Sequence, residues 1–149
     1  MRAVVQRVDD CVVRVDGRET GRIGRGLLVY LGVGKNDTEA DSSLLSEKIA
    51  GLRIFPDASG KMNLSVLDAG GSILVVSQFT LYGDAREGRR PSYSDAAGQE
   101  KALPLYRSFI SSIERLGIAT ARGEFAARMK VEYVNDGPVT ILLDSENRF

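Results

Sequence analysis

The stretch Ile73-Leu74-Val75-Val76-Ser77-Gln78-Phe79-Thr80-Leu81 joins the most strand-like run of the sequence to an abrupt change toward polar residues. The branched and aliphatic side chains of 73–76 favour a buried β-strand. Polar residues that follow such a run lie where the strand ends, and backbone N–H groups can be left without partners there. Ser77, Gln78 and Thr80 are therefore candidates for holding a carbonyl group and its developing oxyanion. The alternative is that Gln78 and Thr80 are the solvent-facing members of an alternating strand.

Strand patterns outnumber helix patterns on both sides of this stretch. Strands are predicted at 2–8, 11–15, 19–23, 27–33, 52–55, 64–67, 118–121, 130–134 and 139–143. One helix is predicted to begin at Asp37-Thr38 and to end at Gly51. A second is predicted from about Asp95 to Leu116, with either a kink or its true start at Pro104. Without regular βαβ alternation, this order indicates an α+β fold of antiparallel or mixed sheets with two main helices on one side. Residues 1–149 are the right length for a single domain.

Composition excludes several kinds of chemistry. The chain contains no histidine, which removes Ser-His-Asp and Cys-His catalysis and His-ligated zinc. The acids show no metal-ligand spacing, so we expect no metal site and no cofactor. Lys plus Arg and Asp plus Glu are balanced at 20 each, so no bulk positive field draws nucleic acid to the protein. A nucleic-acid partner would have to be held locally.

The sequence indicates a cytoplasmic protein without a membrane partner. Its longest apolar stretch, Gly26 to Val33, is far shorter than the roughly 20 residues of a spanning helix, and the N-terminus has no signal-peptide pattern. The single cysteine, Cys11, cannot form an internal disulfide, which agrees with a reducing compartment. Cys11 lies in an alternating apolar run and is interpreted as a strand residue, not a nucleophile.

Two further segments are candidates for function. In Asn135-Asp136-Gly137-Pro138-Val139-Thr140, glycine before proline permits unusual backbone angles, although the pattern alone favours a plain hairpin turn between two strands. Arg86, Arg89 and Arg90, taken with Lys61 and Tyr93, form a modest basic group that could contact phosphate. Exposed arginines in a loop are more often simply solvated.

Taken together, these residues resemble the D-aminoacyl-tRNA deacylase family nearly from end to end. The two signature motifs are Ser77-Gln78-Phe79-Thr80-Leu81 and Asn135-Asp136-Gly137-Pro138-Val139-Thr140, and both are intact. Flanking matches are Met1 to Val8, Leu52-Arg53-Ile54-Phe55, Gly60 to Ser65 and Gly88-Arg89-Arg90-Pro91-Ser92. The chain departs from the family at Ala126, where the family has glycine, but Met129 matches.

The resemblance implies a barrel-like homodimer that hydrolyses the ester between a D-amino acid and its tRNA. It implies that Gly137-Pro138, joined by a cis peptide, reaches into the active site of the other subunit, with Arg7 fixing the orientation of that loop. The segment from Ser77 to Thr80 would line the pocket for the aminoacyl group and the terminal adenosine. By the same matches, the substrate-binding residues are Phe79, Met129, Asn135, Gly137, Pro138 and Arg7.

A chain without histidine needs another route to activate water. The terminal ribose carries a hydroxyl beside the ester, so the resemblance implies RNA-assisted catalysis in which Gln78 and Thr80 position the substrate or face the oxyanion. Thr80 as a covalent nucleophile stays open, although nothing in the sequence supplies it with a base.

Chirality requires rejection of the abundant L-aminoacyl-tRNA. A discrimination of about 10⁴ corresponds to roughly 5.5 kcal/mol, and attraction to varied D side chains cannot supply it. The backbone carbonyls of Gly137 and Pro138 could block the place of an L side chain. Glycine has no side chain, so glycyl-tRNA would be accepted as well. The competing hypotheses are an esterase of small molecules and a non-catalytic RNA-binding dimer, although a pure RNA binder would be expected to show a broad basic face.

Overall fold

The computed structural model describes residues 1–147. Its helices are α1 (Glu39–Ala50), the 3-10 helix η1 (Phe79–Tyr82) and α2 (Gln99–Arg115). Its strands are β1 (Arg2–Val15), β2 (Arg18–Ile23), β3 (Gly26–Gly32), β4 (Phe55–Pro56), β5 (Met62–Leu64), β6 (Ser72–Ser77), β7 (Thr120–Arg122) and β8 (Lys130–Asp144).

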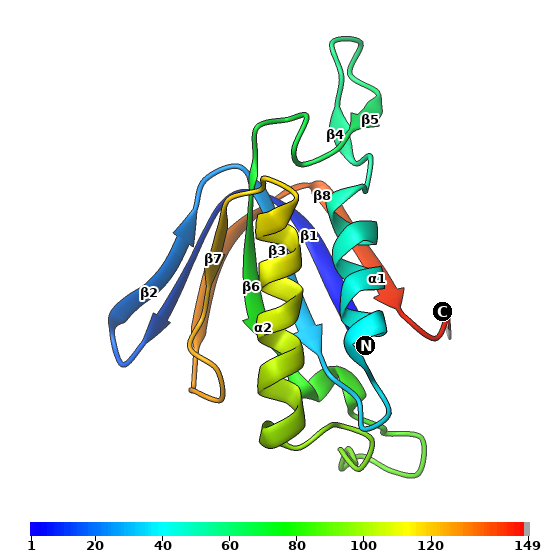
Figure 1. The fold of residues 1–149 in the computed structure, drawn as a ribbon. Coiled ribbons are helices and arrows are strands. Elements are labelled where there is room, and N and C mark those ends of the chain that lie inside the picture. The colour runs from blue at the N-terminus through cyan, green and yellow to red at the C-terminus, as the bar shows by residue number, and fades with distance from the viewer. Residues whose placement is uncertain (148–149) are drawn as a thin grey trace.

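One mixed sheet dominates the fold. Its strands follow the order β2-β1-β3-β6-β7, and β8 pairs with β1. The β3-β6-β7 pairs are parallel and the others are antiparallel. The sheet curls until β2 approaches β7, because a Cβ at Gly21 would lie only 2.5 Å from the Arg122 carbonyl oxygen. The sheet thus nearly closes into a barrel, as predicted, while β4 and β5 form a separate hairpin (Figure 1).

Each face of the sheet buries its own apolar cluster. Successive side chains of a strand point to opposite faces. In β3 and β6, Leu27 and Ile73 join the larger cluster, which α1 and α2 cover, whereas Leu28 and Leu74 join the second cluster on the other face. The strand predicted at 27–33 is therefore confirmed in β3, and it is apolar on both faces. Apolar packing therefore holds β6 on both of its faces.

The predicted bounds of α1 are confirmed and those of α2 are partly wrong. Thr38 caps α1, with its N–H donating to the Asp41 carboxylate at 2.8 Å, and Gly51 ends the helix. The second helix begins at Gln99, because residues 95–97 are held beside β3, where the Ala97 N–H donates to the Val33 carbonyl at 2.9 Å. Pro104 lies inside the helix and does not begin it.

Several predicted strands need correction. Residues 2–15 form one strand, not two. The strand predicted at 64–67 is wrong, because the Asp68 carboxylate accepts a hydrogen bond from the Ser65 N–H at 3.0 Å and holds a turn there. The strand predicted at 118–121 is displaced to Thr120–Arg122, and the short strand near 55 includes Pro56.

The hairpin turn predicted at Asn135 to Pro138 is wrong. Both halves of β8 run in the same direction along β1, since Lys130 pairs with Arg14 and Asp144 pairs with Arg2. Thr140 lies opposite Gln6 and Asn135 opposite Val8, so residues 136–139 bulge out of the ladder opposite the single residue Arg7. The segment is a bulge within one long strand.

Candidate active site

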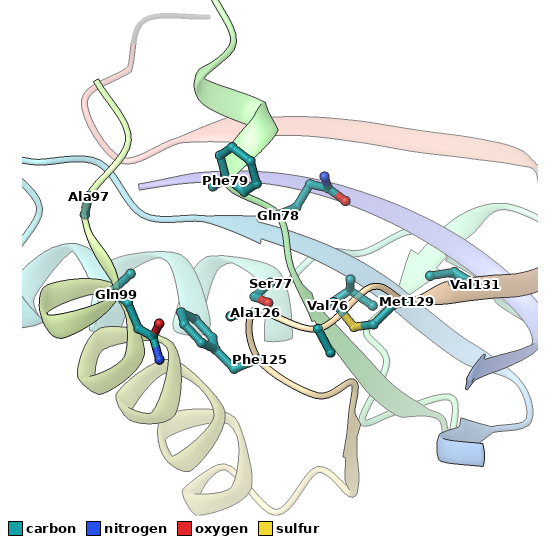
Figure 2. A pocket seen from close by; sticks show the side chains of 12 residues that line it. Val76, Ser77, Gln78, Phe79, Ala97, Gln99, Phe125, Ala126, Met129 and Val131 are labelled. Carbon is teal, nitrogen blue, oxygen red and sulfur yellow. The ribbon is translucent and has the colours of Figure 1, made fainter. Parts of the chain in front are cut away.

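A cavity of about 350 Å³ lies between the end of β6, the start of α2 and the segment that joins β7 to β8 (Figure 2). Its lining is mainly apolar, with polar groups from Ser77, Gln78 and Gln99. The lining residues are Val76, Ser77, Gln78, Phe79, Ala97, Gln99, Ala102, Phe125, Ala126, Ala127, Met129 and Val131. An apolar concavity with a few polar groups is typical of a small-ligand site.

The signature segment leaves the sheet at the mouth of this cavity. The Gln78 N–H makes a last bond to the Leu31 carbonyl at 2.8 Å, and the chain then turns into η1. The interpretation of Thr80 as part of an alternating strand is therefore wrong. The first N–H groups of a helix have no acceptor within it. Those of Phe79 and Thr80 are accordingly suited to stabilise an oxyanion.

Thr80 lies beside the cavity and is not one of its lining residues. Its hydroxyl accepts a hydrogen bond from the Gln78 side-chain amide. An amide N–H cannot take up a proton, so this contact orients the hydroxyl without activating it as a nucleophile. The geometry favours a positioning role for the Gln78 and Thr80 pair.

The opposite wall of the cavity is fixed to β6. A Cβ at Gly123 would lie 2.3 Å from the Met129 sulfur, so only glycine allows Met129 to pack there. The ring of Phe125 packs against Tyr106 with centroids 5.5 Å apart, and the Tyr106 hydroxyl donates to the Val75 carbonyl at 2.9 Å. Burial raises the pKa of Tyr106 to about 12, so this donor keeps its proton at neutral pH.

Ala126 forms the rim of the same wall with a left-handed backbone, at φ +62°. Glycine is the residue that adopts this angle without steric cost, so the structure gives a physical reason for the glycine expected here from the resemblance. For alanine the cost is roughly 1 to 2 kcal/mol. The departure at Ala126 thus keeps the backbone shape and adds one methyl group to the rim.

The Gly137-Pro138 bulge is tied firmly to β1. The Asn135 side-chain amide donates to the carbonyls of Arg7 at 2.9 Å and of Val139 at 3.2 Å. Gly137 has φ +115°, a conformation that L side chains rarely adopt, and its bond to Pro138 is cis, as expected. Both Gly137 and Pro138 are exposed. The bulge is a fixed projection with its tip open to solvent.

Arg7 is the anchor beneath that projection. Its side chain is 10% exposed, and its guanidinium donates to the Ile54 carbonyl. Its Nε lies 2.7 Å from the Asp136 carboxylate. The charge of Arg7 is therefore held next to the bulge, in agreement with the predicted role in orienting it.

The predicted site residues fall into two groups within one chain. Ser77, Phe79 and Met129 gather at the cavity with Gln78 and Thr80, whereas Arg7, Asn135, Gly137 and Pro138 gather at the bulge. Arg7 pairs with Leu27 of β3, and Ser77 pairs with Leu31 of the same strand. This distance along β3 is about 13 Å at the usual rise of a strand. The bulge of one chain therefore does not line its own cavity.

The predicted basic group is only partly assembled. Arg86, Arg89 and Arg90 share the loop between η1 and α2, and Tyr93 of this loop packs edge-on against Phe79 with centroids 5.2 Å apart. Lys61 does not belong with them, because the β4-β5 hairpin projects from the opposite end of the molecule (Figure 1).

Arg86 is neutralised within its own loop. It forms a fork with Asp84, in which its Nε lies 2.9 Å from Oδ1, and this contact lowers the pKa of Asp84 to about 2. Arg86 is thus the least suited of the three arginines to contact phosphate.

Sequence reasoning missed part of the cavity wall. Gln99, Phe125, Ala97 and Ala102 line the cavity but were not predicted to. Gly98 could have marked the start of α2, but only the fold brings this helix end and Gln99 to the cavity. Among residues 1–147, no group of three or more His, Cys, Asp or Glu side chains is placed to hold a metal ion. Within the same described part of the chain, every helix is too short or too polar to cross a membrane.

Known proteins resemble this chain along its full length. A D-aminoacyl-tRNA deacylase of Roseiflexus castenholzii is 63% identical over 97% of this chain and 92% of its own length. A D-aminoacyl-tRNA deacylase of Syntrophobacter fumaroxidans is 58% identical over the whole of both chains. A solved structure described as c-Myc DNA unwinding element binding protein superimposes with a TM-score of 0.91 at 40% identity, covering 97% of this chain and 98% of that one.

A second solved structure shares the fold at lower identity. It is described as a probable eukaryotic D-amino acid tRNA deacylase and superimposes with a TM-score of 0.80 at 18% identity, over 95% of this chain and 97% of that one. Residues 4–144 match the family described as D-Tyr-tRNA(Tyr) deacylase. The resemblance and the enzyme class predicted from the two signature motifs are confirmed: the chain belongs to the D-Tyr-tRNA(Tyr) deacylase family, whose members are hydrolases of the ester bond in aminoacyl-tRNA.

Proposed function

We propose that two copies of this chain form the working deacylase, with the cavity of one copy completed by the Gly137-Pro138 bulge of the other. The observation that carries this proposal is the separation of the two signature motifs, which leaves a rigid projection and an open cavity at different places on one chain. In a two-fold dimer, each copy can give its projection to the cavity of its partner.

Features of the long strand β8 support the proposal that a second copy packs near the bulge. Among residues 1–147 its one partner strand is β1, so its other edge offers unpaired backbone groups. Val134, on one side of the bulge, is 52% exposed, and Leu142, on the other side, is 56% exposed. Burial of these apolar side chains against another copy would stabilise a dimer in the region of the bulge.

The substrate proposed for the completed site is D-aminoacyl-tRNA in the cytoplasm. The relatives named as D-aminoacyl-tRNA deacylases support it. The apolar walls around Phe79 and Met129 suit the terminal adenosine and the aminoacyl group, while Ser77 and Gln78 offer polar atoms. The products are the free D-amino acid and tRNA.

Hydrolysis in this site would rely on the RNA and on backbone donors. Water adds to the ester carbonyl carbon, and the N–H groups of Phe79 and Thr80 stabilise the resulting oxyanion. The ribose hydroxyl beside the ester helps to position the water and relay its proton, since the one described hydrogen bond of the Thr80 hydroxyl comes from the Gln78 amide, which cannot act as a base. The bond to the ribose oxygen then breaks, and that oxygen takes a proton.

Chirality would be set by backbone atoms of the partner's bulge. The carbonyls of the exposed residues Gly137 and Pro138 would fill the position of an L side chain and exclude it by contact. Arg7 and Asn135 hold the bulge in place, so the carbonyls cannot yield to the side chain. Glycyl-tRNA, which presents only hydrogen there, would be cleaved.

A complementation experiment tests the shared site. Gln78→Ala damages only the cavity and Gly137→Ala only the bulge, so each pure variant has two defective sites per dimer. After unfolding and refolding an equal mixture, about a quarter of all sites would combine two intact halves. These sites pair half of the cavities of the Gly137→Ala chains with an intact bulge, so cleavage of L-tyrosyl-tRNA per Gly137→Ala chain should fall by about half in the mixture. An unchanged rate on L-tyrosyl-tRNA, with mixed dimers shown by mass spectrometry, contradicts the shared site.

Substrate variants test the remaining parts of the proposal. Wild-type protein should cleave D-tyrosyl-tRNA and glycyl-tRNA, and should spare L-tyrosyl-tRNA. A D-tyrosyl-tRNA that lacks the ribose hydroxyl next to the ester should be cleaved at least about 100-fold more slowly if the RNA assists the attack. Equal cleavage rates with and without this hydroxyl would show that the protein, and not the RNA, activates the water.

A further inference from the structure

A second hollow of about 350 Å³ lies beside the candidate active site, between β2, α2 and β7. Phe125 lines both cavities and forms the wall between them. The lining residues are Arg18, Glu19, Thr20, Leu103, Tyr106, Arg107, Arg122, Gly123, Glu124 and Phe125. Three arginines in one hollow are notable in a chain whose net charge is zero.

The charges in this hollow do not cancel. Arg18 lies 2.9 Å from the Glu124 carboxylate, and Glu19 is paired with Arg22 at 2.8 Å. Both acids are thereby neutralised. Within residues 1–147, no ion pair is found for Arg107 or Arg122. Two positive charges of the hollow are left for a ligand.

The fold places both guanidinium groups next to the shared wall. Arg122 ends β7, where the close contact with Gly21 joins β7 to β2. Its charge acts on Tyr106, the residue just before Arg107 on α2. Because Tyr106 packs on Phe125, both arginines flank the ring that separates the hollow from the candidate active site. Figure 1 shows β7 between β2 and α2.

We propose that this hollow binds a phosphodiester group of the same aminoacyl-tRNA whose 3′ end occupies the neighbouring cavity. The inference rests on the proposed function. Guanidinium groups bind phosphate oxygens through paired, charge-assisted hydrogen bonds. The phosphates follow the terminal nucleoside directly along the strand, so a positive hollow on the other side of one ring is well placed for them. Without a bulk positive charge, the protein needs such a local contact to hold RNA.

The arginine loop on the other side of the active site is the weaker candidate. The hollow that Arg89 and Arg90 line also contains Asp84 and Glu87. Glu87 thus offsets part of the charge there, even though Asp84 is paired with Arg86. The two flanks can be compared directly, because each contributes two exposed arginines with no ion pair within the described chain.

The test compares two double variants of equal charge change. Arg107→Gln/Arg122→Gln removes the proposed contact, and Arg89→Gln/Arg90→Gln is the matched control. Each is assayed on D-tyrosyl-tRNA and on D-tyrosyl-adenosine, which has no phosphate. For the first variant we expect the KM for the tRNA substrate to rise about tenfold or more. The slope of log KM against log salt concentration should also fall by about 1 to 1.5. Its kcat/KM on D-tyrosyl-adenosine and all values of the control should remain near wild type.

Three results would overturn the inference. Equal increases of the KM for tRNA in both double variants would indicate a general electrostatic attraction. An increase confined to Arg89→Gln/Arg90→Gln would place the RNA phosphates at the arginine loop. An equal loss on D-tyrosyl-adenosine would indicate damage to the catalytic cavity. If the wild type cleaves neither substrate, the proposed function fails, and the phosphate site is then tested by the affinity for uncharged tRNA. A drop in this affinity in Arg107→Gln/Arg122→Gln alone supports the site. An unchanged affinity refutes it.

Discussion

The cavity at the end of β6 and the bulge in β8 carry the two signature motifs, yet they are built in opposite ways. At the cavity, Phe79 is 58% exposed and the walls are apolar side chains. At the bulge, the buried Arg7 and the amide of Asn135 tie the backbone down with polar bonds. Apolar walls adapt to different occupants, whereas a tied backbone keeps its shape. This contrast supports the proposal that the cavity holds the part common to all substrates and that the bulge discriminates among them.

The largest effect should come from Gly137→Ala. The added Cβ would lie 2.8 Å from a Val139 methyl carbon and 3.1 Å from the Arg7 guanidinium, so the bulge must shift. We expect the ratio of D- to L-tyrosyl-tRNA cleavage to fall by about 100-fold or more, since about 3 kcal/mol of discrimination is lost. Gly17→Ala is the control, because Gly17 has φ +78° with nothing within 4 Å of the added atom. An unchanged ratio in Gly137→Ala would remove the bulge from discrimination.

Arg7→Met should weaken the fold as well as the bulge. It leaves the Ile54 carbonyl and the Asp136 carboxylate without their guanidinium, and we expect the free energy of unfolding in urea to drop by about 2 to 3 kcal/mol. Arg14→Met on the same strand removes an exposed pair with Glu132 and should cost less than about 1 kcal/mol. Similar losses in the two variants would show that the bulge is not specially anchored.

The strand that leads into the bulge should lose support at high pH. Cys11 pairs with Tyr133 of β8, and burial, with the charge of Asp10, raises the thiol pKa from 9.0 to about 11. Below pH 9 the thiol is protonated in both the folded and unfolded states, so its contribution is complete. Between pH 9 and 11 only the unfolded thiol ionises, which lowers stability by on the order of 2 kcal/mol. Urea unfolding at pH 8 and 10.5 should show this loss in wild type and not in Cys11→Ala; parallel losses would assign it to other groups.

The smallest effect should come from Phe79→Ala at the cavity. The ring lines the cavity but is largely exposed, so we expect the KM for D-tyrosyl-tRNA to rise about tenfold while the free energy of unfolding changes by less than about 0.5 kcal/mol. Tyr93→Ala is the control, since Tyr93 packs on Phe79 without lining the cavity. A large loss of stability in Phe79→Ala would show that this half is as rigid as the bulge.

Local patterns predicted the elements whose bonds are local. Thr38 and Asp41 at one end of α1 and Gly51 at the other fixed its bounds, because capping involves only near neighbours. The run 73–76 was predicted as a strand and belongs to β6, which pairs with β3 on one side and β7 on the other. The polar residues after it proved to stand at the cavity.

Elements that depend on distant partners were not predictable from pattern. Asn135 to Pro138 has the composition of a turn, and only pairing with β1, more than a hundred residues earlier, makes it a bulge. Residues 95–97 look helical, but hydrogen bonds to residues 33–35, just after β3, hold them outside the helix. The cis bond and the use of the bulge were expected only from the family resemblance. Gln99 and Phe125 reach the cavity through packing that the sequence does not display.

The pairing of β1 with β8 also determines when the molecule can fold during synthesis. Arg2 pairs with Asp144, so one edge of β1 stays open until residues 130–144 have left the ribosome. At about 5 to 20 residues per second, this exposure lasts on the order of ten seconds. An unpaired edge of this length invites pairing with other nascent chains. In a polysome, neighbouring copies are therefore the partners against which this enzyme most needs protection before it is complete.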